Sequence, residues 1–147
     1  MMVDVEGQIL AQAPERALFD GQVQGLAAVF YQNERPPCGL SGALDWHFKG
    51  LISQYLQSGA ILGHVGECCY FPITRHQTTF HILLVGAGHS ERPGNRQSIP
   101  PETFVALQKN LSSLRIPKIG ISMADFGVTS PELLKKRLKG ASVWITP

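Results

Sequence analysis

The stretch from Gly25 to Gly59 constrains the fold more than any other part of the chain, because it combines an apolar run, a proline-rich turn and a long amphipathic pattern. The run Leu26–Tyr31 (LAAVFY) has the composition of a strand that is buried on both faces. Pro36 and Pro37 end this strand, since proline cannot donate a hydrogen bond to a neighbouring strand. The stretch therefore predicts a β-strand followed by an α-helix.

The helix of this unit is predicted from apolar residues that recur at steps of three and four. They are Leu40, Leu44, Phe48, Leu51, Ile52, Tyr55 and Leu56, and they form one stripe of an amphipathic helix. Ser41 is the expected N-cap, and Gly59 is the expected residue just past the last turn.

Strand and helix patterns alternate through the rest of the chain. Thr78–Gly86 is the clearest buried strand, and Gly63–Pro72 predicts a turn and a strand that pairs with it as a hairpin. The other expected elements are two short strands or a hairpin in Met2–Asp20, helices at Pro101–Leu114 and Pro131–Lys139, and strands at Lys118–Ala124 and Ser142–Thr146. This order predicts an α/β sandwich with a mixed, mostly parallel sheet.

Length and composition are those of one folded domain over residues 1–147, with 44% hydrophobic and 16% charged residues. The net charge is +2 and no long basic stripe is present, so nucleic acid is not an expected partner. There is neither a run of eighteen apolar residues nor a signal-peptide pattern, which predicts a cytoplasmic protein without a membrane segment. The three cysteines, Cys38, Cys68 and Cys69, are expected to be free thiols.

Four short motifs occur in a recognisable order: Glu34-Arg35-Pro36, Leu40–Asp45 (LSGALD), Gly63–Glu67 (GHVGE) and Leu83–Gly88 (LLVGAG). Together they resemble the N-terminal domain of the leucyl (cytosol) aminopeptidase family, with His64 where that family usually has Lys. The resemblance implies a macrodomain-like, three-layer α/β/α fold. It also implies that the family's chemistry belongs to a separate C-terminal domain.

Peptidase chemistry is not expected of this chain. The family's Asn-Thr-Asp-Ala-Glu-Gly-Arg motif is absent, and the eleven acidic residues are dispersed, whereas two-metal hydrolysis needs clustered carboxylates. His64 and Cys68 have the only spacing worth considering for a metal, and ordinary turn and strand positions explain both. No metal and no cofactor is therefore predicted, and the chain is expected to be non-catalytic.

One candidate ligand-binding loop follows the clearest strand, because backbone amides in a glycine-rich turn can bind a phosphate. It consists of Gly86, Ala87, Gly88, His89 and Asn95. A dinucleotide fingerprint is excluded, since Glu91 stands where the third glycine would be. An asparagine followed by a run of glycines, as in macrodomains, is not visible. The alternative is that the glycines only end a buried strand.

These observations leave several functions open. The first interpretation is a non-catalytic domain with an assembly, partner-binding or regulatory role, through a protein partner or self-association. Exposed aromatic side chains would mark the partner surface, and Trp46, Trp144 and Phe126 are the candidates. The alternatives are a macrodomain-like binder of ADP-ribose or another nucleotide, and a non-catalytic subunit of a separately encoded metallo-aminopeptidase.

Overall fold

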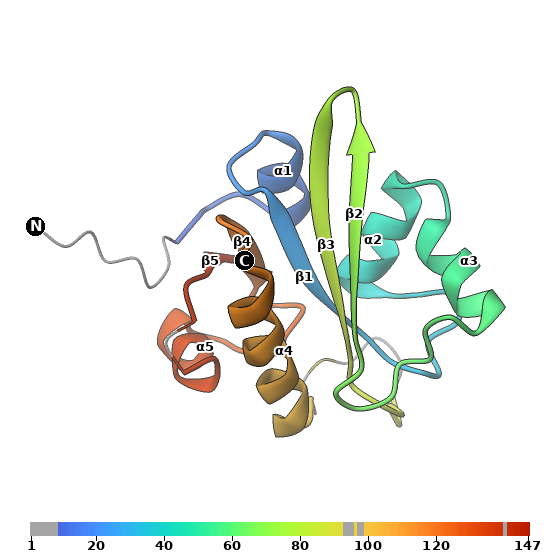
Figure 1. The fold of residues 1–147 in the computed structure, drawn as a ribbon. Helices are drawn as coiled ribbons and strands as arrows, with labels where there is room; N and C mark the ends of the chain where they lie inside the picture. Colours follow the sequence, from blue (N-terminus) through green and yellow to red (C-terminus); the bar gives the residue numbers. More distant parts are fainter. Residues whose placement is uncertain (1–8, 93–95, 97–98, 140) are drawn as a thin grey trace, which may run out of the picture.

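The computed structural model describes residues 9–92, 96, 99–139 and 141–147. Its centre is a five-stranded sheet in the order β2-β3-β1-β4-β5 (Figure 1). The strands are β1 (Gly25–Phe30), β2 (Cys68–Arg75), β3 (Thr78–Gly86), β4 (Ile119–Ser122) and β5 (Trp144–Thr146). Strand β2 runs antiparallel to β3, and the other neighbouring pairs are parallel. The predicted mixed, mostly parallel sheet and the β2–β3 hairpin are confirmed.

Helices cover both faces of the sheet. They are α1 (Pro14–Phe19), α2 (Gly39–His47) and α3 (Leu51–Ser58) on one face, and α4 (Pro101–Leu114) and α5 (Pro131–Arg137) on the other. One hydrophobic core lies under each set of helices. The predicted three-layer α/β/α sandwich is therefore confirmed.

Strand β1 is the central strand, and all six of its residues are buried. Alternate side chains enter opposite cores: Leu26 and Phe30 pack with α1–α3, whereas Val29 packs with α4 and α5. The chain then leaves β1 toward α2 on one face, while the neighbouring strands β3 and β4 lead to α4 and α5 on the other face. The carboxyl end of β1 is therefore the point at which the connections change face.

The long helix predicted between Leu40 and Gly59 is two helices. Lys49 and Gly50 adopt left-handed backbone conformations, with φ of 57° and 80°, and these end α2 before α3 begins. The Asp45 carboxylate accepts hydrogen bonds from the backbone N–H and the hydroxyl of Ser53, at 2.9 and 2.5 Å, and so supports the start of α3. The apolar stripe is preserved because both helices pack on the same core.

The prediction that Ser41 is the N-cap of this helix is also wrong. Helix α2 begins at Gly39 with Cys38 as its N-cap residue, so Ser41 is already inside the first turn. Its buried hydroxyl donates to the carbonyl oxygens of Cys38 and Val29, at 3.0 and 3.1 Å, and ties the helix to β1.

The N-terminal prediction of strands or a hairpin in Met2–Asp20 is not confirmed. Residues 2–8 lie outside the described residues, and the rest of the segment contains α1, with proline at its start and Leu18 buried in the core. Ile9 forms an isolated bridge with Ile145 of β5.

The remaining elements agree with the sequence except at their ends. Helix α4 has the predicted bounds, and the Ser130 side chain caps α5 by accepting from the Leu133 N–H, at 3.2 Å. Strands β4 and β5 and helix α5 are shorter than predicted. Within the described part of the chain, none of the helices has the length and apolar character needed to cross a membrane.

Candidate functional site at the carboxyl end of β1

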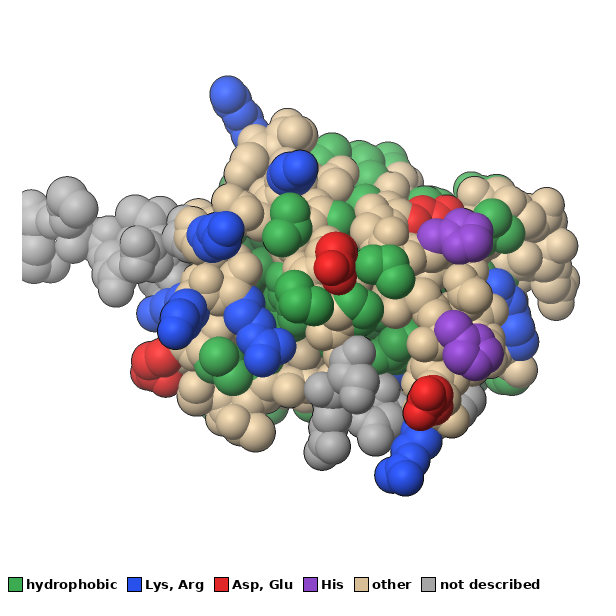
Figure 2. Space-filling view, turned by 90° about the horizontal axis from the view of Figure 1, so that it is seen from below, with side chains coloured by type: hydrophobic (Ala, Val, Ile, Leu, Met, Phe, Trp, Pro, Cys, Tyr) green, Lys and Arg blue, Asp and Glu red, His purple; other side chains and the backbone are tan. Residues whose placement is uncertain are grey.

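The carboxyl ends of β1, β3 and β4 meet at one edge of the sheet, which Figure 2 views directly. Hydrophobic, histidine and basic side chains are exposed on this edge. In open α/β sheets, ligands bind outside the carboxyl ends of strands where the connections change face. In this protein that point is the end of β1.

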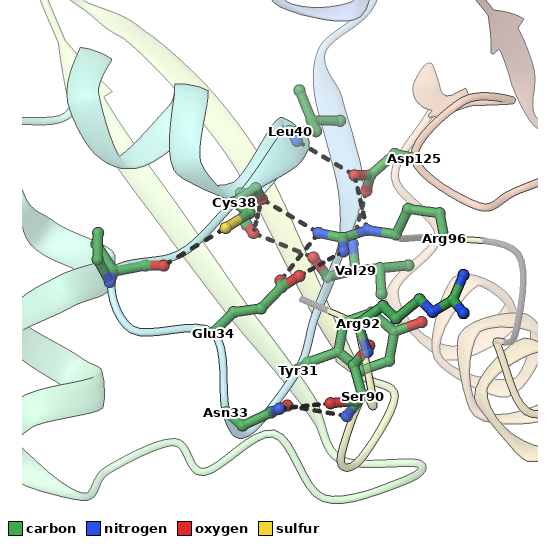
Figure 3. Close-up of polar contacts among 12 residues, drawn as sticks. Val29, Tyr31, Asn33, Glu34, Cys38, Leu40, Ser90, Arg92, Arg96 and Asp125 are labelled. Atoms are coloured by element: carbon green, nitrogen blue, oxygen red, sulfur yellow. Dashed lines mark hydrogen bonds and ion pairs between the residues drawn. The ribbon is translucent and has the colours of Figure 1, made fainter. Parts of the chain in front are cut away.

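Asp125, in the turn after β4, joins three elements at this point (Figure 3). Its buried carboxylate accepts hydrogen bonds from the backbone N–H groups of Val29 in β1, at 2.8 Å, and Leu40 in α2, at 3.2 Å. The first amides of a helix have no partner within the helix and carry a partial positive charge. The Asp125 carboxylate therefore acts as an anion bound at the N-terminus of α2.

Arg96 lies between Asp125 and a second buried carboxylate, that of Glu34. Its Nη1 and Nη2 atoms donate to the two Glu34 oxygens at 2.8 and 3.1 Å, and Nη2 also donates to the Cys38 carbonyl at 3.2 Å. The Arg96 Nε atom lies 3.5 Å from Asp125 Oδ1. We call Glu34, Arg96 and Asp125 the ion cluster. In it, two carboxylates share one guanidinium.

Burial and neighbouring charges shift the pKa values of Asp125 and Arg96 in the ion cluster. Burial raises the pKa of Asp125 above its ordinary value, while Arg96 and the N–H groups of Val29 and Leu40 act in the opposite direction. Burial works to lower the pKa of Arg96, but its hydrogen bonds to Glu34 and its attraction to Asp125 raise it, so the guanidinium stays charged.

Two buried polar atoms at the ion cluster have no hydrogen-bond partner among the described residues: the Tyr31 hydroxyl and Arg96 Nε. The Arg96 guanidinium lies over the Tyr31 ring, 5.1 Å from its centre. Burial raises the pKa of Tyr31, so its hydroxyl stays protonated and keeps its donor. Buried polar groups usually have hydrogen-bond partners, so these two atoms stand out among the buried side chains.

The loop predicted to bind a nucleotide lies beside the ion cluster, at the end of β3. Its members are Gly86, Ala87, Gly88, His89 and Asn95, of which Asn95 lies outside the described residues and His89 is exposed. The amides of the first three donate to backbone carbonyls, at 2.7, 3.0 and 2.8 Å, of Glu67, Phe30 and Gly63. Those N–H groups are thus engaged within the fold, and contact of this loop with a ligand stays a prediction.

Close packing explains the glycines of this loop. A Cβ atom on Gly86 would meet the backbone of His64 and would lie 2.8 Å from the carbonyl carbon of Gly63. Gly88 has a φ of 81°, and a Cβ there would lie 2.7 Å from a methyl group of Val65. The turn at residues 63–67 therefore packs directly on the end of β3.

Sequence reasoning missed Arg96 and Asp125. An acidic residue directly after a short buried strand was an available signal for Asp125, whereas Arg96 stands in a polar loop with no pattern around it. Glu34, which stands in the sequence only as part of a short motif, forms a buried ion pair with Arg96. No group of three His, Cys, Asp or Glu side chains that could hold a metal occurs in the part of the chain that the structure describes.

The three aromatic candidates for a partner surface differ in exposure. The prediction for Phe126 is wrong, because this side chain is fully buried against Phe104. Trp144 is partly buried and contacts Lys118. Trp46 is 79% exposed and is the candidate that remains.

Comparisons with known proteins identify the fold. No family model and no curated protein matches the sequence. Among solved structures, the macrodomain of Thermus aquaticus DarG has a TM-score of 0.66 at 13% identity, over 95% of this chain and 97% of that one. Thermosipho africanus DarTG in complex with ADP-ribose has a TM-score of 0.59 at 8% identity, over 88% of this chain and 39% of that one.

A mutant tomato leucine aminopeptidase also matches, with a TM-score of 0.59 at 17% identity. The match covers 95% of this chain but only 32% of that enzyme, so it gives the aminopeptidase resemblance weak support. At these identities the likeness concerns the fold alone. The chain has a macrodomain-like α/β/α fold.

Proposed function

We propose that this protein binds ADP-ribose or a related nucleotide at the carboxyl end of β1. The observation that carries the proposal is the convergence of the Val29 and Leu40 N–H groups and the Arg96 guanidinium on one anionic group. A helix N-terminus with a nearby arginine is the chemistry that binds a phosphate. In this structure the anion at that position is the carboxylate of Asp125.

Two further observations support this proposal over an assembly role. The likeness to DarG macrodomains extends over nearly the whole of both chains, and the DarTG neighbour was solved in complex with ADP-ribose. In addition, the Tyr31 hydroxyl needs a hydrogen-bond partner that a ligand hydroxyl or phosphate would supply.

The predicted loop after β3 belongs to the same proposal. The Gln32 N–H donates to the Gly88 carbonyl at 2.9 Å, and the Asn33 amide bonds the backbone of Ser90 at 2.6 and 2.9 Å. These contacts hold the loop against the residues that follow β1. We infer that Ala87, Gly88 and His89 border the ligand, through groups other than their engaged amides.

A second candidate function, binding of a protein partner, is favoured by one observation. Trp46 is 79% exposed on α2, and Phe19 of α1 is 40% exposed. Large aromatic side chains dominate protein interfaces. This surface lies away from the ion cluster, so the two functions can be tested separately.

Calorimetric and thermal-shift titration with ADP-ribose, ADP and AMP tests the nucleotide proposal. Saturable binding is expected, with about 2.7 kcal/mol of added stability at one hundred times the dissociation constant. The substitution Tyr31→Phe removes only the unpaired hydroxyl and should weaken binding about three- to tenfold, the equivalent of one hydrogen bond.

Tyr55→Phe is the matched control, because Tyr55 of α3 packs against Phe71 of β2 on the other face of the sheet. It should leave nucleotide affinity unchanged. Absence of binding by all three nucleotides at millimolar concentration would reject the proposed function. Equal affinity of the Tyr31→Phe variant and the unmodified protein would reject the proposed position of the site.

A further inference from the structure

We propose that Asp125 is an internal anion that competes with an external phosphate for the N-terminus of α2. A nucleotide would then bind by displacing the Asp125 carboxylate rather than by entering an empty pocket. This inference names the regulation of the site above and so rests on the proposed function. Its first test, however, uses simple anions and does not depend on the nucleotide.

The contacts of Asp125 are those of a bound anion. Donors from three separate parts of the chain meet at its carboxylate: the Val29 N–H of β1 at 2.8 Å, the Leu40 N–H of α2 at 3.2 Å and Arg96 Nε at 3.5 Å. Each of these donors would serve a phosphate oxygen equally well.

Charge makes the two occupants mutually exclusive. The cluster already holds two carboxylates, Glu34 and Asp125, against one guanidinium. A phosphate placed beside both carboxylates would meet strong repulsion in a poorly solvated site. If the Asp125 side chain turns outward, the phosphate inherits its donors, and Glu34 still holds Arg96 in place through two hydrogen bonds.

One unpaired group points to a ligand independently of the helix end. The Tyr31 hydroxyl is buried without a hydrogen-bond partner among the described residues, and Tyr31 is only 2% exposed. Asp125 accepts hydrogen bonds from Val29 and Leu40 and forms an ion pair with Arg96, but the Tyr31 hydroxyl makes no hydrogen bond to it. A larger anion with more acceptor oxygens could accept from that hydroxyl as well. The internal anion is therefore an incomplete occupant of the site.

The substitution Asp125→Ala tests this inference directly, because it removes the carboxylate and leaves its donors. Formate and inorganic phosphate should raise the melting temperature of this variant saturably, at ionic strength held constant with chloride. The unmodified protein should show no saturable shift. ADP-ribose should bind the variant at least tenfold more tightly than the unmodified protein.

Asp45→Ala is the matched control. Asp45 also accepts a backbone N–H at the start of a helix, that of Ser53 at 2.9 Å, but it forms no ion pair with an arginine among the described residues. Formate and phosphate should not rescue this variant. If Asp125→Ala fails to fold, Asp125→Asn keeps the side-chain shape without the charge and should bind phosphate more tightly than the unmodified protein.

Three outcomes would overturn the inference: no saturable anion effect on Asp125→Ala, equal rescue of Asp125→Ala and Asp45→Ala, or, where only Asp125→Asn folds, unchanged phosphate affinity. Rescue by formate and phosphate without any ADP-ribose binding would support the internal anion and reject the nucleotide function. The two proposals can therefore fail separately.

Discussion

The ends of β1 and β3 are neighbours at one edge of the sheet, yet they satisfy their backbone amides in different ways. At the end of β3, the amides of Gly86, Ala87 and Gly88 donate to backbone carbonyls. At the end of β1, the amide of Val29 and that of Leu40, at the start of α2, donate to the Asp125 side chain. A side chain can leave by rotation about its own bonds, whereas a backbone carbonyl leaves only if the chain around it moves. The end of β1 is thus the place where a ligand can replace a contact.

The largest expected loss of stability at either strand end comes from Arg96→Ala. This substitution leaves Glu34 and Asp125 buried without their shared cation. Breaking a buried ion pair in this way costs about 3–5 kcal/mol. Urea denaturation should show this loss of unfolding free energy. Arg92→Ala, at an exposed residue four positions earlier, is the control and should change stability by less than about 0.5 kcal/mol. A loss below about 1 kcal/mol for Arg96→Ala would contradict a buried ion cluster.

An intermediate effect is expected from Gly86→Ala at the other strand end. The new methyl group would press on the backbone of His64 and Gly63, and such overpacking costs about 1–3 kcal/mol. Hydrogen exchange should accelerate at the Gly66 and Gly88 amides, because both are bonded across this packing contact.

Gly59→Ala provides the contrast for that experiment. Gly59 has a φ of 77°, and a Cβ atom at this position would have no neighbour within 4 Å, so alanine there costs only backbone strain. It should leave exchange at Gly66 and Gly88 unchanged. Equal exchange in the two variants would show that the end of β3 is not held by the turn at residues 63–67.

The smallest expected effect concerns pH. Cys68 pairs with Val85 near the end of β3, and burial, with a contribution from Cys69, raises its pKa to about 12 from an ordinary value of 9.0. The unfolded chain then loses the thiol proton at lower pH than the folded protein does. The stability linked to Cys68 is therefore complete below about pH 9 and falls as the pH rises toward about 12.

Cys68→Ala should flatten this alkaline decline in a series of urea unfolding curves. Ser112→Ala, at an exposed position of α4, is the control because it removes no titratable group, and it should leave the slope unchanged. A decline that is identical in all three proteins would mean that the Cys68 thiol ionises as readily in the folded protein as in the unfolded chain.

Much of the fold was predictable because local patterns and tertiary contacts agree. The apolar run of β1, the hairpin of β2 and β3, and the proline-started helices α4 and α5 were all visible in the sequence. The break between α2 and α3 was not, because Lys49 and Gly50 interrupt the backbone without interrupting the apolar spacing. Helix α1 was missed for a different reason: its six residues are too few to show the apolar spacing of a helix.

The candidate site was predicted less well than the fold. Its glycines after β3 are local in sequence and were visible, but the charged groups come from residues 34, 96 and 125, which only the fold brings together. Long-range ion pairs leave no periodic pattern, and a single Arg in a polar loop looks like any exposed cation. The sequence therefore predicted the loop after β3 but not Asp125, whose carboxylate binds the N-terminus of α2.

The central position of β1 also affects how the chain is made. Strand β1 is synthesised well before its partners, which are residues 81–86 of β3 and 119–121 of β4. Its apolar sequence cannot be covered on both edges until β4 has also been translated. Pairing between strands so distant in sequence is also slow, because a long loop must close first. Between the synthesis of β1 and of β4, both edges of an apolar strand are therefore not yet paired, which is the condition under which chains tend to aggregate.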